Sequence, residues 1–69
     1  MESIKYRCFW TGSRKADAIM SSRQEVERVH PMSKAIVVKV FRGRELMTEY
    51  LVSWMGDHFK WDACHSIDD

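Results

Sequence analysis

The stretch KAIVVKVFR, residues 34–42, decides the fold that this sequence predicts. Ile36, Val38 and Val40 form one side of an alternating pattern, and the residues between them form the other. An alternation of period two, rich in β-branched residues, is typical of a β-strand. Gly43 follows directly and favours a turn. We therefore expect a strand over residues 34–42 that ends at this glycine.

Two further strands are predicted on the C-terminal side. Residues 47–55 carry apolar side chains on both sides, with Tyr50, Val52 and Trp54 on one and Met47, Leu51 and Met55 on the other. This pattern favours a strand covered on both faces. Gly56-Asp57-His58 predicts a hairpin turn, and residues 59–64 return with Phe59, Trp61 and Ala63 on one face. Short turns of this kind favour an antiparallel meander.

A strand and a helix are expected on the N-terminal side. Residues 3–10 alternate, and Thr11-Gly12-Ser13 interrupts them. Residues 13–30 have apolar side chains at helical spacing and end before Pro31, which predicts one helix. Ser22-Arg23-Gln24-Glu25 also matches a capping box, so two short helices that meet at Ser21-Ser22 are the alternative.

The predicted fold class is α+β with the order β-α-β-β-β. A chain of 69 residues has the length of one small domain, here over residues 1–69. We expect a four-stranded, mainly antiparallel sheet with one helix packed on one face. The predicted core consists of Ile4, Tyr6, Cys8, Ile19, Met20, Val26, Ile36, Val38, Val40 and Leu51.

The first residues, MESIKYR, lack the apolar segment of a secretory signal, and no apolar run is long enough to span a membrane. We therefore expect a cytoplasmic protein that does not bind a membrane. A reducing compartment predicts that Cys8 and Cys64 are free thiols, both mostly buried. Residues 66–69 form a polar, acidic tail that we expect to fray.

The charge is divided between the two parts of the chain. Residues 1–44 hold ten basic and four acidic side chains, whereas residues 45–69 hold one basic and six acidic ones. The net charges are therefore +6 and −5, which sum to +1. Such asymmetry points to a charged partner.

Basic residues mark one candidate surface, for nucleic acid. If the first strand pairs with the strand over 34–42, Lys5, Arg7 and Lys39 form one patch with Phe9 and Phe41 between them. Arg42 and Arg44 extend it at the following turn. Basic and aromatic side chains on one sheet face are a signature of nucleic-acid binding.

The acidic, aromatic hairpin is the second candidate surface, for a protein partner. Its expected contact residues are Tyr50, Trp54, Asp57, Phe59, Trp61 and Asp62. Trp61 is the foremost candidate, since tryptophan is enriched at the energetic centres of interfaces. The alternative is that Trp61 only caps the core. Opposite charges on one small domain also suit self-association. The 47–55 strand is apolar on both faces and one helix can cover only one, so we expect a homodimer that buries Tyr50, Val52 or Trp54.

The sequence predicts no catalytic site, no metal and no cofactor. His58, Cys64 and His65 lie close in sequence, but their spacing fits no zinc pattern. The three glycines are isolated turn residues and form no phosphate-binding loop.

Residues 50–62, YLVSWMGDHFKWD, resemble the core hairpin of chromodomain and chromo-barrel modules. The resemblance implies that Trp54 and Trp61 are two walls of a methyl-lysine cage and that the chain reads a peptide. Asp57 stands where that family has a further aromatic residue.

The layout of a strand, a helix and a meander is similar to that of small phage-encoded inhibitors, including some type I-F anti-CRISPR proteins. Lys60, Trp61, Asp62 and Cys64 carry the match. The resemblance implies a non-enzymatic inhibitor that blocks a host nucleic-acid-binding complex. A protein-binding inhibitor is accordingly the leading functional hypothesis. Nucleic-acid binding through the basic patch is the alternative.

Overall fold

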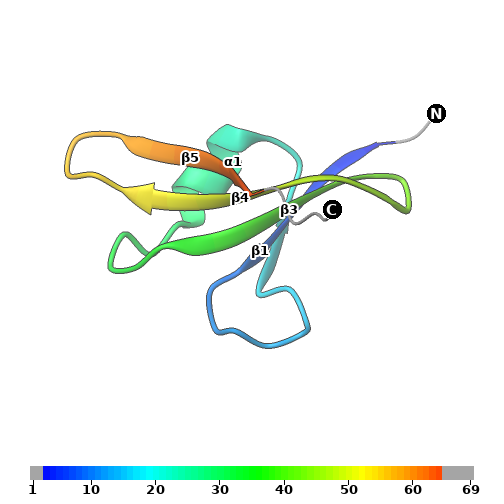
Figure 1. Ribbon diagram of the computed structural model, residues 1–69, viewed down its shortest axis with the longest axis horizontal. Helices are drawn as coiled ribbons and strands as arrows, with labels where there is room; N and C mark the ends of the chain where they lie inside the picture. The colour runs from blue at the N-terminus through cyan, green and yellow to red at the C-terminus, as the bar shows by residue number, and fades with distance from the viewer. Residues whose placement is uncertain (1–2, 65–69) are drawn as a thin grey trace.

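A computed structural model describes residues 3–64 as a single sheet with one helix. The strands are β1 (Ile4–Phe9), β2 (Ala18–Met20), β3 (Ile36–Arg42), β4 (Glu45–Trp54) and β5 (Phe59–Cys64), and the helix is α1 (Arg23–Val29). Figure 1 shows the long strands crossing the molecule and α1 lying behind the sheet. The α+β class is confirmed, but the sheet has five strands instead of the predicted four.

The order of strands in the sheet is β2-β1-β3-β4-β5, and every pairing is antiparallel. β1 lies between β2 and β3, so the expected pairing of the first strand with the 34–42 strand is present. From β3 onward the chain forms the predicted antiparallel meander. A register shift at Val40/Phe41 moves the pairing from Thr48 to Leu46 and leaves Met47 as the extra residue of a bulge on β4.

The predicted helix over residues 13–30 is wrong in its first half. Residues 18–20 instead form β2, in which Ala18 pairs with Cys8 and Met20 with Tyr6. Three consecutive apolar residues are too few to distinguish a strand from one helical turn, and pairing with β1 decides between them. The second of the two short helices that the capping box suggested is present.

Serine residues determine where α1 begins. Ser22 is the N-cap, and its hydroxyl accepts a hydrogen bond from the Glu25 backbone N–H at 3.3 Å. The Glu25 carboxylate in turn accepts bonds from the backbone and hydroxyl of Ser21. Because these bonds favour the charged form, the pKa of Glu25 lies below its ordinary value. The N-cap bond of the capping box is therefore present, while its Glu25 carboxylate bonds Ser21, the residue before the N-cap, in place of the Ser22 backbone.

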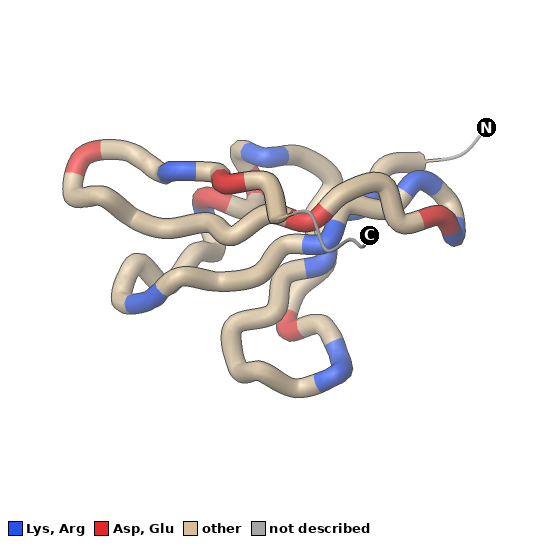
Figure 2. The backbone as a smooth tube through the Cα atoms, viewed as in Figure 1, with Lys and Arg blue, Asp and Glu red and all other residues tan. Residues whose placement is uncertain are grey.

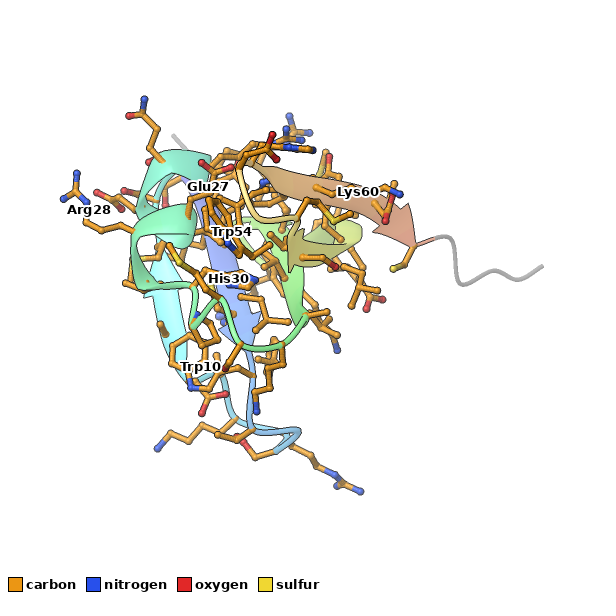
Figure 3. All side chains as sticks on the ribbon, turned by 90° about the vertical axis from the view of Figure 1, so that its left-hand side faces the viewer. Trp10, Glu27, Arg28, His30, Trp54 and Lys60 are labelled. Carbon is orange, nitrogen blue, oxygen red and sulfur yellow. The ribbon has the colours of Figure 1, made fainter. Side chains whose placement is uncertain are left out.

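The core lies between α1 and one face of the sheet, which we call the inner face. The buried hydrophobic residues are Cys8, Val26, Ile36, Val38, Val40 and Val52. Figure 3 shows Trp54 and His30 on the side of the sheet that α1 covers and Lys60 on the other side. The opposite face carries no helix, so among the described residues the sheet is covered on one face only.

Three residues of the predicted core are exposed. Ile4 is 38%, Ile19 53% and Leu51 37% exposed, while Val52, which was not in the predicted core, is fully buried. Within this single chain the 47–55 strand is therefore covered on one face only, and covering of its other face by a second copy stays a prediction. Because side chains alternate along a strand, placing Val52 on the inner face turns Leu51 outward. The predicted dimer surface of Tyr50, Val52 and Trp54 faces the core for the same reason.

His30, the C-cap of α1, connects the C-terminal end of this helix to the sheet through a hydrogen bond. It is 5% exposed, and its Nε2 lies 2.8 Å from the carbonyl oxygen of Val52. The backbone N–H of Met32 donates to His30 Nδ1 at 2.9 Å. Since Nδ1 accepts, Nε2 must carry the proton and donate to Val52. One neutral tautomer thus satisfies both ring nitrogens.

The two cysteines are free, as predicted, but only Cys8 is buried. Burial, and to a lesser extent the negative charge of Asp17, raises the pKa of the Cys8 thiol to about 11. Cys64 lies exposed at the end of β5. The expectation that both thiols are mostly buried is therefore wrong for Cys64.

We expect dithionitrobenzoate at pH 8 to modify Cys64 rapidly and Cys8 only after unfolding, because the thiolate is the reacting form and Cys8 is both neutral and inaccessible. The released thionitrobenzoate absorbance should show one fast equivalent in the native protein and two in denaturant. Cys64→Ser should remove the fast phase. Absence of any reactive thiol before reduction would indicate a disulfide instead.

Candidate nucleic-acid interface

The sheet face away from α1, the outer face, gathers the basic and aromatic residues of β1 and β3. Lys5 pairs with Phe41, Arg7 with Lys39 and Phe9 with Val37. Alternate residues of a strand share a face, so the side chains of all six residues lie on the outer face. We call Lys5, Arg7, Phe9, Lys39 and Phe41 the basic–aromatic face. Figure 2 shows basic positions on β1, β3 and the loop that follows β1.

Each phenylalanine of the basic–aromatic face lies under a cation. The Arg7 guanidinium carbon is 4.8 Å from the centre of the Phe41 ring. The Lys39 ammonium is 5.3 Å from the centre of the Phe9 ring. Both contacts run diagonally between β1 and β3, so the two cations lie side by side and one ring lies on either side of them.

The cations of this face are not neutralised by carboxylates. Among residues 3–64, Lys5, Arg7 and Lys39 form no ion pair within 4 Å. Glu49 is the cross-strand partner of Lys39. The ammonium of Lys39 nevertheless lies over Phe9 and makes no ion pair with this carboxylate. Arg7 and Lys39, two like charges, therefore lie directly opposite each other, and neither is ion-paired with a carboxylate among the described residues.

The β1–β2 loop, residues 10–17, is held in shape by Asp17. Its carboxylate accepts hydrogen bonds from the backbone N–H groups of Trp10 at 2.8 Å and Thr11 at 3.1 Å, and from the Thr11 hydroxyl. Desolvation raises the pKa of Asp17, but these bonds and the charge of Lys34 outweigh it, so the pKa lies below its ordinary value. Gly12 takes a φ of +82°, which glycine adopts without strain.

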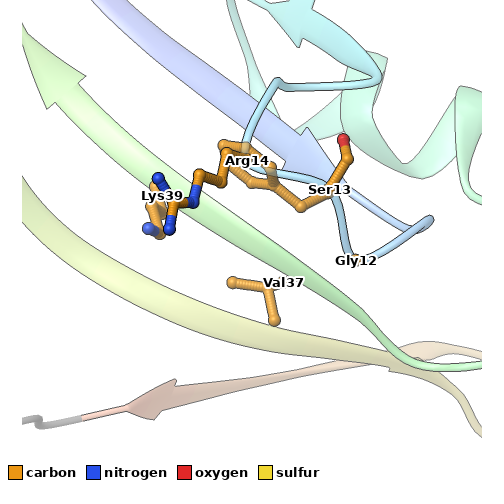
Figure 4. A pocket seen from close by; sticks show the side chains of 6 residues that line it. Gly12, Ser13, Arg14, Val37 and Lys39 are labelled. Atoms are coloured by element: carbon orange, nitrogen blue, oxygen red, sulfur yellow. The ribbon is translucent and has the colours of Figure 1, made fainter.

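This loop encloses a hollow at one end of the basic–aromatic face. The hollow has a volume of about 460 Å³, and Phe9, Gly12, Ser13, Arg14, Val37 and Lys39 line it. Figure 4 shows the Arg14 side chain reaching from the loop toward Lys39, with Val37 beside them. None of the six lining residues is acidic. We call this feature the loop hollow.

The structure thus brings together Lys5, Arg7 and Lys39 from the residues that the sequence suggested for nucleic acid. Arg42 lies at the end of β3, opposite Ile4 and Glu45, and Arg44 lies in the turn that follows. Arg14 was missed, because residues 13–30 were expected to be helical. The Thr11-Gly12-Ser13 break was the signal available for this hairpin.

The residues suggested for a protein partner do not share one exposed surface. The aromatic ones are half-buried on the inner face, where Trp61 contacts Tyr50 edge-on at 5.3 Å. The indole N–H of Trp61 donates to Glu27 at 2.9 Å, and Arg23 lies 4.7 Å above the Trp61 ring. Trp54 packs against Phe59 at 4.7 Å.

The two acidic residues of that set are exposed. Asp57 is in the turn and contacts His58, while Asp62 is on β5 and faces Lys60 at 3.9 Å. Residues 3–64 contain no group of three or more His, Cys, Asp or Glu side chains that could hold a metal ion. His65 and the tail over residues 66–69 lie outside the described residues.

No family model, curated protein or solved structure matches this chain. The resemblances to chromo modules and to phage-encoded inhibitors therefore stay predictions. The only helix described in residues 3–64 has seven residues, too few to cross a membrane.

Proposed function

We propose that this chain acts by binding and not by catalysis, and that its basic–aromatic face binds a single-stranded nucleic acid. The Arg7–Lys39 pair carries the proposal. Like charges directly opposite in a sheet are destabilising. Residues that lower the stability of the fold are expected at sites that serve function. A phosphate backbone laid across these strands would supply the missing negative charge.

The two phenylalanines favour a strand with accessible bases. A cation over an exposed ring contributes about 0.5–1 kcal/mol. A nucleic-acid base stacked on an aromatic side chain contributes about 1–3 kcal/mol. Moving Arg7 and Lys39 from the rings to phosphates, and placing bases on Phe9 and Phe41, is therefore a favourable exchange. In the unbound protein the two cations would cover the rings, and in the complex they would contact the phosphate backbone of the nucleic acid.

A single strand fits this surface better than a duplex. Phe9 is aligned with Val37, four residues from Phe41 along β3, which corresponds to about 13 Å. Two stacking positions on an open sheet suit unpaired bases, whose flat faces are accessible. A duplex keeps those faces stacked inside and would meet the surface only through its phosphates.

Salt dependence tests the proposal. Binding of fluorescent dT12 and rU12 should weaken steeply as salt rises, because each phosphate contact releases about 0.7 counterions from a single strand. Contacts from Lys5, Arg7 and Lys39 predict a log–log slope of roughly −2.1, three times that value. The slope is measured by fluorescence anisotropy between about 50 and 200 mM salt. This range includes ionic strengths of about 0.1 M, at which screening between charges is substantial.

A 12-base-pair duplex serves as the comparison ligand in the same titration. We expect it to bind more weakly than either single strand at every salt concentration, since it offers no base to Phe9 or Phe41. No measurable binding of dT12 or rU12 at the lowest salt would contradict the proposed function. Duplex binding equal to that of the single strands would contradict the stacking part.

A protein-blocking function is the second candidate, because β4 and β5 give the outer face a different chemistry. Leu46 and Met47 on β4 are 45% and 47% exposed. Leu51 pairs with Asp62, and Glu49 lies two residues before it. Apolar side chains with acidic neighbours suit docking on a basic protein surface. Under this reading, capture of a host protein survives nuclease treatment, is lost in Leu51→Glu and persists when Arg7 and Lys39 are changed.

A further inference from the structure

We infer that the loop hollow holds one nucleotide of the bound strand, with its base against Phe9 and Val37 and its phosphate between Arg14 and Lys39. This inference rests on the proposed function and specifies how part of the same surface would be used. A volume of about 460 Å³ lies in the range of small-molecule sites, roughly 300–1,000 Å³. The hollow therefore has room for a group of nucleotide size.

The lining separates into two kinds of surface that match the two ends of a nucleotide. Phe9 and Val37, paired across β1 and β3, provide adjacent apolar surface for a base. Arg14 and Lys39 provide the positive charge. Arginine suits phosphate because its planar guanidinium donates two parallel hydrogen bonds. Neither cation forms an ion pair among residues 3–64, so both are available to an anion.

The rim of the hollow is built before any ligand arrives. Asp17 fixes both ends of the loop, since its carboxylate accepts from Trp10 and Thr11 and its backbone N–H donates to the Cys8 carbonyl oxygen at 2.8 Å. The Ser13 hydroxyl donates to the Lys15 carbonyl oxygen at 2.8 Å, which adds a further hydrogen bond within the loop. A site that is already ordered loses less entropy on binding.

The position of the hollow makes it the end of a continuous path. Phe9 and Lys39 belong both to the hollow and to the basic–aromatic face. A strand that contacts Arg7 and stacks on Phe41 would therefore reach the hollow by following β1 and β3. Lys15 is the residue next to Arg14 on the same loop but does not line the hollow, which makes it a matched control.

Mononucleotides test the inference directly. In ¹⁵N-labelled protein, UMP and dTMP should shift the backbone amide signals of Gly12, Ser13, Arg14 and Val37. Uridine and inorganic phosphate, added separately, should each bind more weakly than UMP. Equal shifts and equal midpoints for phosphate and UMP would show an adventitious anion site and overturn the inference. Comparing UMP with dTMP distinguishes RNA from DNA as the source of the nucleotide.

Variants supply the second readout. Phe9→Leu should weaken UMP and rU12 binding roughly five- to 150-fold, the equivalent of one lost stacking contact. Arg14→Ala should weaken both at least about tenfold through loss of a charge-assisted hydrogen bond. Lys15→Ala should change them by less than about threefold, as expected of a solvated charge. Circular dichroism checks that each variant is folded.

The outcomes separate this inference from the proposed function. If rU12 and dT12 bind normally to Arg14→Ala, and no ligand shifts residues 12–14, the nucleotide site is overturned while the basic–aromatic face, which does not include Arg14, stands. If neither oligonucleotide binds the unmodified protein, both proposals fall.

Discussion

Replacing Arg7 and Lys39 together by glutamate should abolish nucleic-acid binding. Each cation is expected to contribute a charge-assisted hydrogen bond of about 1.5–3 kcal/mol. Losing two such bonds weakens binding by at least about 100-fold, and the new negative charges add repulsion against phosphates. Anisotropy of labelled dT12 and rU12 at low salt measures this loss. The fold should survive, because Arg7 is exposed and Lys39 half-buried on the uncovered face.

Arg28→Glu combined with Lys60→Glu is the matched control. The pair again consists of one arginine and one lysine, both exposed, and changes the net charge equally. Arg28 is on α1, and Lys60 is on β5, two strands from β3. We expect a loss of less than about tenfold, from weakened long-range attraction only. An equal loss in both double variants would show that net charge, and not this face, determines binding.

Neutral substitution adds a stability test of the same pair. In Arg7→Gln with Lys39→Gln, relief of the like-charge contact is worth about 0.2–1 kcal/mol, and each of the two lost cation–π contacts about 0.5–1 kcal/mol, so the two effects partly cancel and the net loss is below about 2 kcal/mol. The free energy of unfolding should therefore change little while nucleic-acid affinity falls. A large loss of stability would instead mean that these cations serve the fold.

Trp61→Ala should destabilise the protein by about 3 kcal/mol, the lower end of the range for a buried aromatic residue because Trp61 is only half-buried. The substitution removes the contacts with Tyr6 and Tyr50 and the bond to Glu27 that joins α1 to β5. For a domain of this size, that loss lowers Tm by roughly 12–24 °C. Thermal and urea unfolding followed by circular dichroism measure the change.

Leu51→Ala is the control for this second prediction. Leu51 is a large apolar residue on the neighbouring strand but lies 37% exposed on the outer face, so its loss should cost less than about 1.5 kcal/mol. Trp61→Phe should fall between the two, since it keeps a ring but loses the hydrogen bond to Glu27. A Trp61→Ala protein that melts like the parent yet no longer captures a protein partner would restore Trp61 as a contact residue.

The strands could be predicted from the sequence because their patterns are local. Alternation in residues 34–42 comes from the geometry of an extended chain, so β3 was expected almost at its observed bounds, Ile36–Arg42. The capping box at Ser22 likewise marks the start of α1, because the bonds it makes lie within one helical turn. The grouping of Lys5, Arg7 and Lys39 followed once β1 was assumed to pair with β3.

Which face of β4 is covered could not be read from the sequence. In residues 47–55 both sets of alternating side chains are apolar, so Val52 and Leu51 are equivalent candidates for the core. Val52 is buried because the pairing of β4 with β3 places it opposite Ile36 on the side where α1 packs. The same pairing places Trp61 on the inner face, where its indole N–H donates to Glu27. The residue type alone suited an exposed contact residue equally well.

The sequence by itself determined the extended strands, the helix cap and the split of charge along the chain, because each depends on residues close in sequence. The tertiary structure alone decided that residues 18–20 join β1 as a strand, since three residues satisfy helical and extended spacing equally well. It also brought Arg14 beside Lys39, because only the closed β1–β2 hairpin joins residues so distant in the chain into one hollow.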